Sequence, residues 1–302
     1  MPCSTAALDI PDLSGQVIIV TGGTAGLGLE SIRQLSTHHA AHIYLAARSQ
    51  DKADTVIREL RNSIPKACPI TFLPLDLSSF ASIKAAAATF LQSESRLDIL
   101  MNNAGIMMTP EGLTEDGYEL QFGTNVMGPA LFTLLLLPLL QQTAKLNPQT
   151  RVVNLSSASE KAAPSDLYPL EELKTPMSSR HTTARYTLSK IACIHYTTVL
   201  ATLYKEFKFI SVHPGMVATS LHHNSTGIFL KPFLNAAIFF ATPVEKGARS
   251  QLWAAVSPDA HSGEYYGPVG AVEPGSKNAR RPELRDQLWH WMKQELSRHV
   301  VM

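Results

Sequence analysis

Apolar and polar positions along the chain alternate between two kinds of segment. Six short runs are apolar and rich in β-branched residues, as expected of buried strands: residues 16–20, 42–46, 70–75, 97–101, 151–155 and 209–213. Longer segments with helical spacing lie between them: residues 27–38, 51–62, 79–93, 114–142 (one long helix or two) and 182–207. Such alternation predicts βαβ units with right-handed crossovers. We therefore expect an α/β fold, a single doubly wound Rossmann-type domain over residues 1–302, with a central parallel sheet of about seven strands and helices on both faces.

Two regions depart from this alternation, and a C-terminal tail follows them. Residues 158–181 hold three prolines and scattered Ser and Thr, which predicts a long loop, and loops of this length in compact domains are usually functional. Residues 221–242 are rich in Phe and Leu but contain Lys231 and Pro232. Residues 281–299 read as a closing surface helix. No repeat or linker divides the chain, so these regions are expected to be parts of one domain.

Composition excludes several classes of protein. Hydrophobic residues make up 45% and charged residues 17%, enough for a large core, and the net charge of +1 gives no basic stripe for nucleic acid. The three cysteines, Cys3, Cys68 and Cys193, form no closely spaced pair, which argues against a disulfide framework or a zinc site and for a reducing, cytoplasmic location. No metal is expected, and His213, His222 and His223 are interpreted as loop or crevice residues.

No integral membrane segment is expected. The first 13 residues contain no apolar run, so they resemble neither a signal peptide nor an anchor. The most apolar stretch, residues 130–140, is shorter than the ~20 residues that a bilayer requires, and a buried core helix explains it. Its part 132–140 would also suit a helix-bundle interface in a homodimer, so a homodimer remains possible.

A glycine-rich turn follows the first expected strand. It reads Thr21-Gly22-Gly23-Thr24-Ala25-Gly26-Leu27-Gly28, with glycines spaced as G-x-x-x-G-x-G and a helix starting inside it. Glycine permits close approach of the backbone to a diphosphate or a positive φ, and the helix N-terminus offers free N–H groups. A tight structural turn would use glycine too, but the strand before and the helix after favour a nucleotide phosphate site.

The second expected strand indicates which nucleotide binds. NAD-binding sheets usually end this strand with an acidic residue on the ribose hydroxyls. Here the strand runs into Arg48-Ser49, where a guanidinium can bind a 2′-phosphate. This pattern favours NADP(H), although an ordinary solvated charge would also explain Arg48.

Tyr186 and Lys190 are the candidate proton-handling pair. They stand four apart on an expected helix and so share a face, and a cation beside a phenol favours the phenolate. Such a tyrosine can exchange a proton with a carbonyl or alcohol oxygen. Tyr204 and Lys208 have the same spacing, but Tyr204 lies about 27 Å further along the helix, at the opposite edge of the sheet.

The chain resembles the short-chain dehydrogenases/reductases from Ser14 to about Trp291. Six motifs carry the resemblance in order: the glycine turn, Asn102-Asn103-Ala104-Gly105, Asn125 in Thr124-Asn125-Val126-Met127-Gly128, Asn154-Leu155-Ser156-Ser157, Tyr186 with Lys190, and Pro214-Gly215-Met216-Val217-Ala218-Thr219. Tyr186 follows Ser157 by 29 positions, more than in compact members. The longer gap and the C-terminal region resemble the retinol-dehydrogenase-like and protochlorophyllide-reductase-like branch, especially its fungal members.

The resemblance implies a catalytic tetrad of Asn125, Ser157, Tyr186 and Lys190. Tyr186 would be the general acid/base, and Ser157, preferred over Ser156, would stabilise charge on the substrate oxygen. Lys190 would hold the nicotinamide ribose, and Asn125 would hold a water linking Lys190 to solvent. The protein would thus be an NADP-dependent short-chain dehydrogenase/reductase.

The resemblance also implies which residues bind the cofactor. Asp76 would bind the adenine amino group, although it could instead cap the helix that follows. The residues around Asn103 would pass the adenosine ribose, and the segment from Pro214 would contact the carboxamide. The complete expected set is Gly22, Thr24, Gly26, Leu27, Gly28, Arg48, Ser49, Asp76, Leu77, Asn103, Ala104, Gly105, Tyr186, Lys190, Pro214, Gly215, Val217 and Thr219.

The substrate is expected to be a hydrophobic small molecule. The aromatic and aliphatic residues of 221–242 would suit a lid over an apolar substrate, with a core-facing helix or a membrane-skimming surface as alternatives. The expected reaction is hydride transfer to or from a carbonyl or alcohol carbon. Two other functions use the same scaffold: a non-redox isomerase or dehydratase, and a non-catalytic module that senses the nucleotide.

Overall fold

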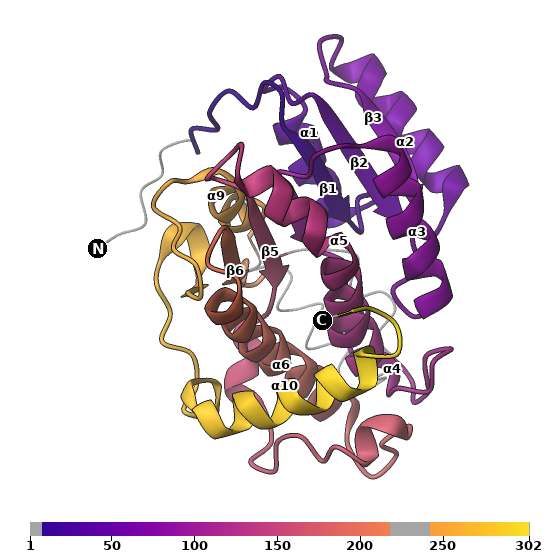
Figure 1. Cartoon of the computed structure of the whole chain (residues 1–302), viewed down its shortest axis with the longest axis vertical. Helices are drawn as coiled ribbons and strands as arrows, with labels where there is room; N and C mark the ends of the chain where they lie inside the picture. The colour runs from indigo at the N-terminus through magenta and orange to yellow at the C-terminus, as the bar shows by residue number, and fades with distance from the viewer. Residues whose placement is uncertain (1–7, 218–241, 302) are drawn as a thin grey trace.

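A single parallel sheet of seven strands organises the chain (Figure 1), in a computed structural model that describes residues 8–217 and 242–301. The strands are β1 (Val17–Thr21), β2 (His42–Ala47), β3 (Ile70–Pro74), β4 (Ile99–Asn102), β5 (Arg151–Leu155), β6 (Lys208–Val212) and β7 (Tyr265–Tyr266). Their order is β3-β2-β1-β4-β5-β6-β7. The direction of winding reverses between β1 and β4, and ligands of doubly wound sheets bind at such a switch point. The expected α/β fold class is confirmed.

Helices cover both faces of the sheet (Figure 1). One face packs against α3 (Phe80–Ser93), α5 (Gly128–Ala144) and α6 (Thr182–Leu203), and α10 (Pro282–Leu296) lies against α6. The other face packs against α1 (Gly26–Leu35), α2 (Gln50–Ser63) and α9 (Arg249–Val256). Two short helices precede longer ones in the sequence: α4 (Leu120–Phe122) comes before α5, and α8 (Val244–Gly247) comes before α9. Alternate residues of one strand, such as Ile18 and Ile19, enter opposite cores, which explains why the strands read as continuous apolar runs.

The expected helix from residue 114 was wrong at its start. The chain first makes a tight turn in which Gly117 has φ +81° and the amide of Thr114 donates to the carbonyl of Tyr118. Helix α4 begins only at Leu120, where the Glu119 carboxylate caps it by accepting from the amide of Phe122. A π-helical turn, η1 (Gly123–Met127), then leads into α5. The apolar pattern extended through the turn because Tyr118 is itself buried.

The 158–181 loop is folded against α6. It contains two 3₁₀ turns, η2 (Ala158–Ala162) and η3 (Glu172–Lys174). The buried hydroxyl of Tyr168 lies 2.6 Å from Nδ1 of His195 on α6, while Nε2 of His195 lies 3.1 Å from the carbonyl oxygen of Asn278. Burial lowers the pKa of His195 to about 4, so its ring is neutral at pH 7. This polar contact joins the loop, the helix and the C-terminal region.

One helical stretch of the described residues, Leu120–Ala144, is long and apolar enough to cross a membrane, but 83% of its most apolar window is buried inside the protein. Phe132 and Leu140 are fully buried there, so packing within the chain accounts for this stretch.

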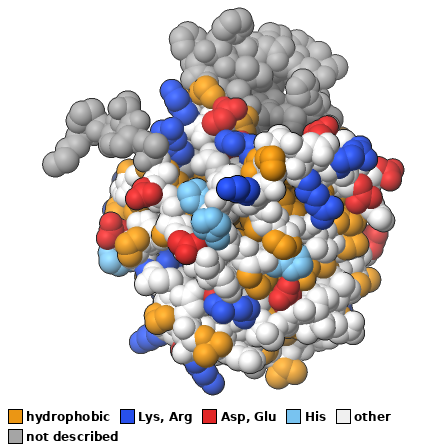
Figure 2. Space-filling view, turned by 90° about the horizontal axis from the view of Figure 1, so that it is seen from above, with side chains coloured by type: hydrophobic (Ala, Val, Ile, Leu, Met, Phe, Trp, Pro, Cys, Tyr) orange, Lys and Arg blue, Asp and Glu red, His pale blue; other side chains and the backbone are white. Residues whose placement is uncertain are grey.

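On the face seen in Figure 2, acidic and basic side chains are intermingled.

Candidate active site

The glycine turn joins β1 to α1 and requires glycine at three of its positions. Gly22 and Gly26 have φ of +70° and +54°, a region that side chains with a Cβ rarely adopt. A Cβ on Gly28 would lie 2.4 Å from the carbonyl oxygen of Gly22, so Gly28 is required for close packing. The N-cap of α1, Ala25, offers no side-chain cap, so the first N–H groups of the helix are left for an external acceptor.

A cleft of about 680 Å³ lies at the carboxyl ends of the strands, beside this turn. Of the expected site residues, those lining it are Gly22, Thr24, Gly26, Leu27, Arg48, Asp76, Leu77, Asn103, Ala104, Gly105, Ser157, Tyr186, Lys190, Pro214, Gly215 and Val217. Gly28, Ser49 and Asn125 are not in the lining. Thr219 and residues 221–241 of the expected lid are outside the described residues.

The end of the cleft near β2 holds Arg48 and Asp76. Arg48 is exposed and makes no hydrogen bond or ion pair with any residue in the described part of the chain, so its guanidinium is available. Ser49 is the N-cap of α2, where its hydroxyl accepts from the amide of Lys52 at 3.4 Å. The interpretation of Asp76 as a helix cap was wrong, because Ser79 caps α3 while the Asp76 carboxylate accepts from the amide and the hydroxyl of Ser78.

The segment after β4 is fixed by Thr21, the first residue of the glycine turn, and by Gln251, which no motif contains. The hydroxyl of Thr21 accepts from the amide of Ala104 at 3.0 Å, and the amide group of Asn103 donates to the carbonyl of Thr21 at 2.8 Å. On α9, the buried Nε2 of Gln251 donates to Oδ1 of Asn103 at 3.1 Å and to the hydroxyl of Ser31 at 2.7 Å. Gln251 thereby ties the glycine-turn helix to the Asn103 segment, from a position far along the sequence.

Tyr186 and Lys190 lie on successive turns near the start of α6, and both line the cleft. Nζ of Lys190 lies 5.7 Å from the centre of the Tyr186 ring and donates to the carbonyl of Leu155 at 3.0 Å. The hydroxyl of Ser156 is buried and donates to the carbonyl of Lys190 at 2.7 Å. Ser157 is half-buried in the lining, and its hydroxyl accepts from Ser159. Both serines line the cleft, but the hydroxyl of Ser156 is already committed to the Lys190 carbonyl.

Known proteins of one family resemble this chain. The family model for short chain dehydrogenases matches residues 16–167. A short-chain dehydrogenase/reductase of Armillaria gallica is 39% identical over 94% of this chain and 91% of its own, and retinol dehydrogenase 12 of Mus musculus is 34% identical over 95% and 87%. A crystal structure of a protein from Mycobacterium paratuberculosis is 28% identical, with a TM-score of 0.73 over 95% of each chain.

The chain belongs to the short-chain dehydrogenase/reductase family. Its retinol-dehydrogenase-like branch and the fungal likeness are also confirmed. Membership of this family makes the protein an oxidoreductase.

Within this dehydrogenase/reductase fold, Asn125 lies behind the lining, in η1. Its Oδ1 accepts from the amide of Ile106 at 2.8 Å, and its Nδ2 donates to the carbonyl of Ile106 and to the hydroxyl of Ser189. A Cβ on Gly105 would lie 3.3 Å from Oδ1 of Asn125 and 3.4 Å from Nζ of Lys190, so both groups approach the Gly105 backbone. The side chain of Asn125 is thus engaged by protein atoms.

The second tyrosine-lysine pair lies far from the cleft. Tyr204 is the C-cap of α6, where its ring packs near Phe209, and Lys208 begins β6 and bonds to Gln149 and Pro258. Neither residue lines the cleft. The helix therefore separates the two pairs, as its length predicted.

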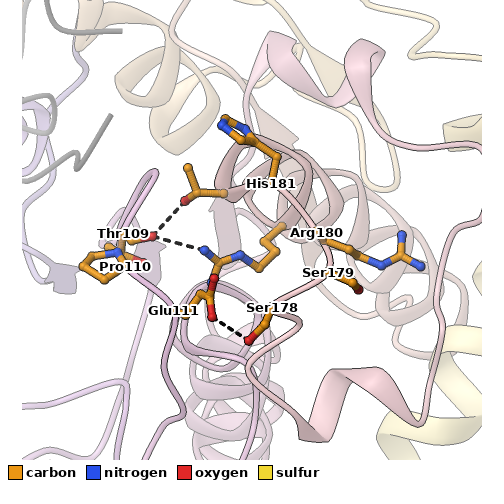
Figure 3. Close-up of a pocket in the computed structure, with 9 residues that line it drawn as sticks. Thr109, Pro110, Glu111, Ser178, Ser179, Arg180 and His181 are labelled. Carbon is orange, nitrogen blue, oxygen red and sulfur yellow. Dashed lines mark hydrogen bonds between the residues drawn. The ribbon is translucent and has the colours of Figure 1, made fainter. Parts of the chain in front are cut away.

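Part of the cleft lining is apolar. Its wall comprises Ile106, Met107, Met108, Leu120 and Met216. A shallower hollow of about 420 Å³ shares only Thr109 with the cleft and is polar (Figure 3). In that view Ser178 bonds to Glu111, while Arg180 points away from both.

Proposed function

We propose that this protein interconverts a carbonyl and an alcohol on a hydrophobic small molecule, using NADP(H), with Tyr186 as the general acid/base. The observation that carries the proposal is that Tyr186, Lys190 and Ser157 line the same cleft as the glycine turn. Groups that move a proton thus share one space with groups suited to a dinucleotide.

The cleft fits a dinucleotide phosphate at three points. The uncapped N-terminus of α1 and the positive-φ glycines suit the diphosphate. Thr124 lines the cleft with a buried hydroxyl that has no partner among the described residues, which an external hydrogen-bonding group would satisfy. Arg48 follows β2 at the place where NAD-binding sheets usually carry an acidic residue, which supports NADP(H) over NAD(H).

The chain's own residues handle the oxygen of the substrate. Ser157 donates a hydrogen bond to the carbonyl oxygen, and Tyr186 delivers a proton to it as negative charge develops. Lys190 stabilises the phenolate that remains, and it would hold the nicotinamide ribose of a bound cofactor. When bound, NADPH supplies the hydride for the carbonyl carbon.

A hydrophobic substrate is supported by the methionine-rich wall of the cleft, because methionine side chains adapt to irregular apolar surfaces. Retinol dehydrogenase 12, a relative, is named for an apolar alcohol. The two described cysteines, Cys68 and Cys193, are free and buried, which supports our proposal of a cytoplasmic enzyme.

The test is an absorbance assay at the reduced nicotinamide band, with a panel of aromatic and aliphatic carbonyl compounds. We expect NADPH to be consumed in step with alcohol formation. Conversion of the substrate without NADPH oxidation would instead identify a non-redox isomerase or dehydratase. Binding of NADPH with no conversion of any compound would identify a nucleotide-sensing module.

A further inference from the structure

The apolar wall of the cleft is fastened by two amide side chains four residues apart, Gln121 and Asn125. Both lie between the wall segment, residues 106–109, and helix α6. Asn125 belongs to the tetrad implied by the family, whereas Gln121 has no assigned role. Gln121 is fully buried, so each of its polar atoms needs a protein partner.

Gln121 joins the wall segment to the first turn of α6. Its Oε1 accepts from the amide of Met108 at 2.8 Å, and its Nε2 donates to the carbonyl of Thr182 at 3.1 Å. The hydroxyl of Thr182 donates to the carbonyl of Thr109 at 2.8 Å, a bond drawn in Figure 3. These contacts form a ring of hydrogen bonds through Gln121, Thr182 and the wall.

Asn125 makes the equivalent connection at the other end of the wall. It bonds to both backbone groups of Ile106 and to the hydroxyl of Ser189 on α6. Tyr186 lies between Thr182 and Ser189 on the same helix. The wall segment is therefore attached to α6 on both sides of Tyr186, and these attachments fix the distance between the wall segment and the phenol.

The conformation that Gln121 holds is an unusual one. Met108 has φ of +51°, which residues other than glycine rarely adopt. Such a conformation persists only where the surroundings determine it, and the amide of Met108 is held by Gln121. In this conformation Met107 and Met108 both line the cleft.

We propose that Gln121 is a positioning residue that holds the wall segment, with Met107 and Met108, at a set distance from Tyr186. It thereby determines which hydrophobic carbonyl compounds reach the phenol. This inference rests on the proposed function. A bulky substrate must lie along the wall, whereas a short one reaches Tyr186 without touching it. The effect of Gln121 therefore grows with the size of the substrate.

The experiment compares Gln121→Met with wild type on a polycyclic aromatic ketone and a short aliphatic aldehyde. We expect kcat/KM for the ketone to fall about tenfold or more, mainly through KM, as for a lost buried hydrogen bond. The aldehyde should change by less than about threefold, and the Kd of NADPH by less than about twofold. Gln142→Met, an exposed substitution of the same type on α5, is the matched control and should match wild type.

Gln121→Glu is a second test variant, whose substrate preference should depend on pH. It can replace Gln121→Met if that variant fails to fold. A protonated glutamic acid accepts from the Met108 amide and donates to the Thr182 carbonyl, as glutamine does. The ionised form cannot donate and repels that carbonyl. The ketone-to-aldehyde ratio of this variant should therefore approach wild type at low pH and fall as the pH rises, while the wild-type ratio stays level.

Equal losses for both substrates, or an unchanged ratio with no pH dependence in Gln121→Glu, would overturn the inference and leave Gln121 only structural. If none of the carbonyl compounds caused wild type to oxidise NADPH, the proposed function would fail, and this result is distinct from a failure of the inference about Gln121. In that case, calorimetry measures how tightly the same two compounds bind to the NADP⁺ complexes of wild type and Gln121→Met, without turnover. Selective weakening of the ketone supports the inference, and unchanged binding overturns it.

Discussion

Replacing Arg48 with alanine tests how the protein distinguishes NADPH from NADH. Arg48 lines the cleft beyond β2 and is not committed to another residue in the described part of the chain. A hydrogen bond between charged groups contributes about 1.5–3 kcal/mol. Because Arg48 is exposed, solvent screening favours the lower figure, and ~1.5 kcal/mol corresponds to about tenfold in Kd.

The assay is fluorescence titration of both reduced nucleotides. Wild type should bind NADPH about tenfold or more tightly than NADH, and Arg48→Ala should weaken NADPH alone by that factor. Added salt should narrow the wild-type preference, because it screens an exposed charge. Arg58→Ala, on the exposed side of α2, is the control and should keep the preference. Equal affinity of wild type for both nucleotides would refute the reasoning from Arg48.

Three further predictions concern packing, the serine pair and acid stability. Gly28→Ala should cost about 1–3 kcal/mol of unfolding free energy by denaturant titration, because its Cβ meets the Gly22 backbone. Ser157→Ala should lower kcat about 100-fold or more, whereas Ser156→Ala should chiefly lower stability by about 1 kcal/mol through its bond to Lys190. Protonation of His195 on unfolding, from a folded pKa of about 4, should remove ~3 kcal/mol of stability as the pH falls from about 6.5 to 4.

The controls for these predictions are specific. Gly112→Ala should be nearly neutral, since its Cβ would meet no atom closer than 3.6 Å. For the serines, comparable losses of kcat in the two variants would contradict the assignment of Ser157. His195→Gln should flatten the difference in stability between pH 7 and pH 4, and a wild-type slope that persists in this variant would show that other groups cause it.

Much of the fold was predictable because a parallel sheet buries both faces of its strands. Strand β5 has the expected bounds, and the glycine turn identified the start of α1. The late start of α4 was not visible in the pattern, because Tyr118 is buried like a helix residue while Gly117 breaks the helix.

The site, too, contains residues that the sequence predicted and residues that it did not. The order of the motifs predicted that Tyr186, Lys190 and Ser157 share one cleft, because each lies where an element begins or ends at the same edge of the sheet. Gln121 and Gln251 were missed because a glutamine in a helix gives no local signal of its distant partners. Ser49 follows Arg48 in sequence but turns to cap α2, a preference that serine satisfies wherever a helix begins.

The central claim, that Tyr186 moves the proton, is tested most directly by Tyr186→Phe beside Tyr204→Phe from the far end of α6. The measurement is the single-turnover rate of carbonyl reduction at saturating NADPH, with the Kd of NADPH determined for each variant. Tyr186→Phe should lose about 100-fold or more in rate with its NADPH affinity nearly intact, and Tyr204→Phe should match wild type. A Tyr186→Phe enzyme that reduces the carbonyl at the wild-type rate would contradict the account.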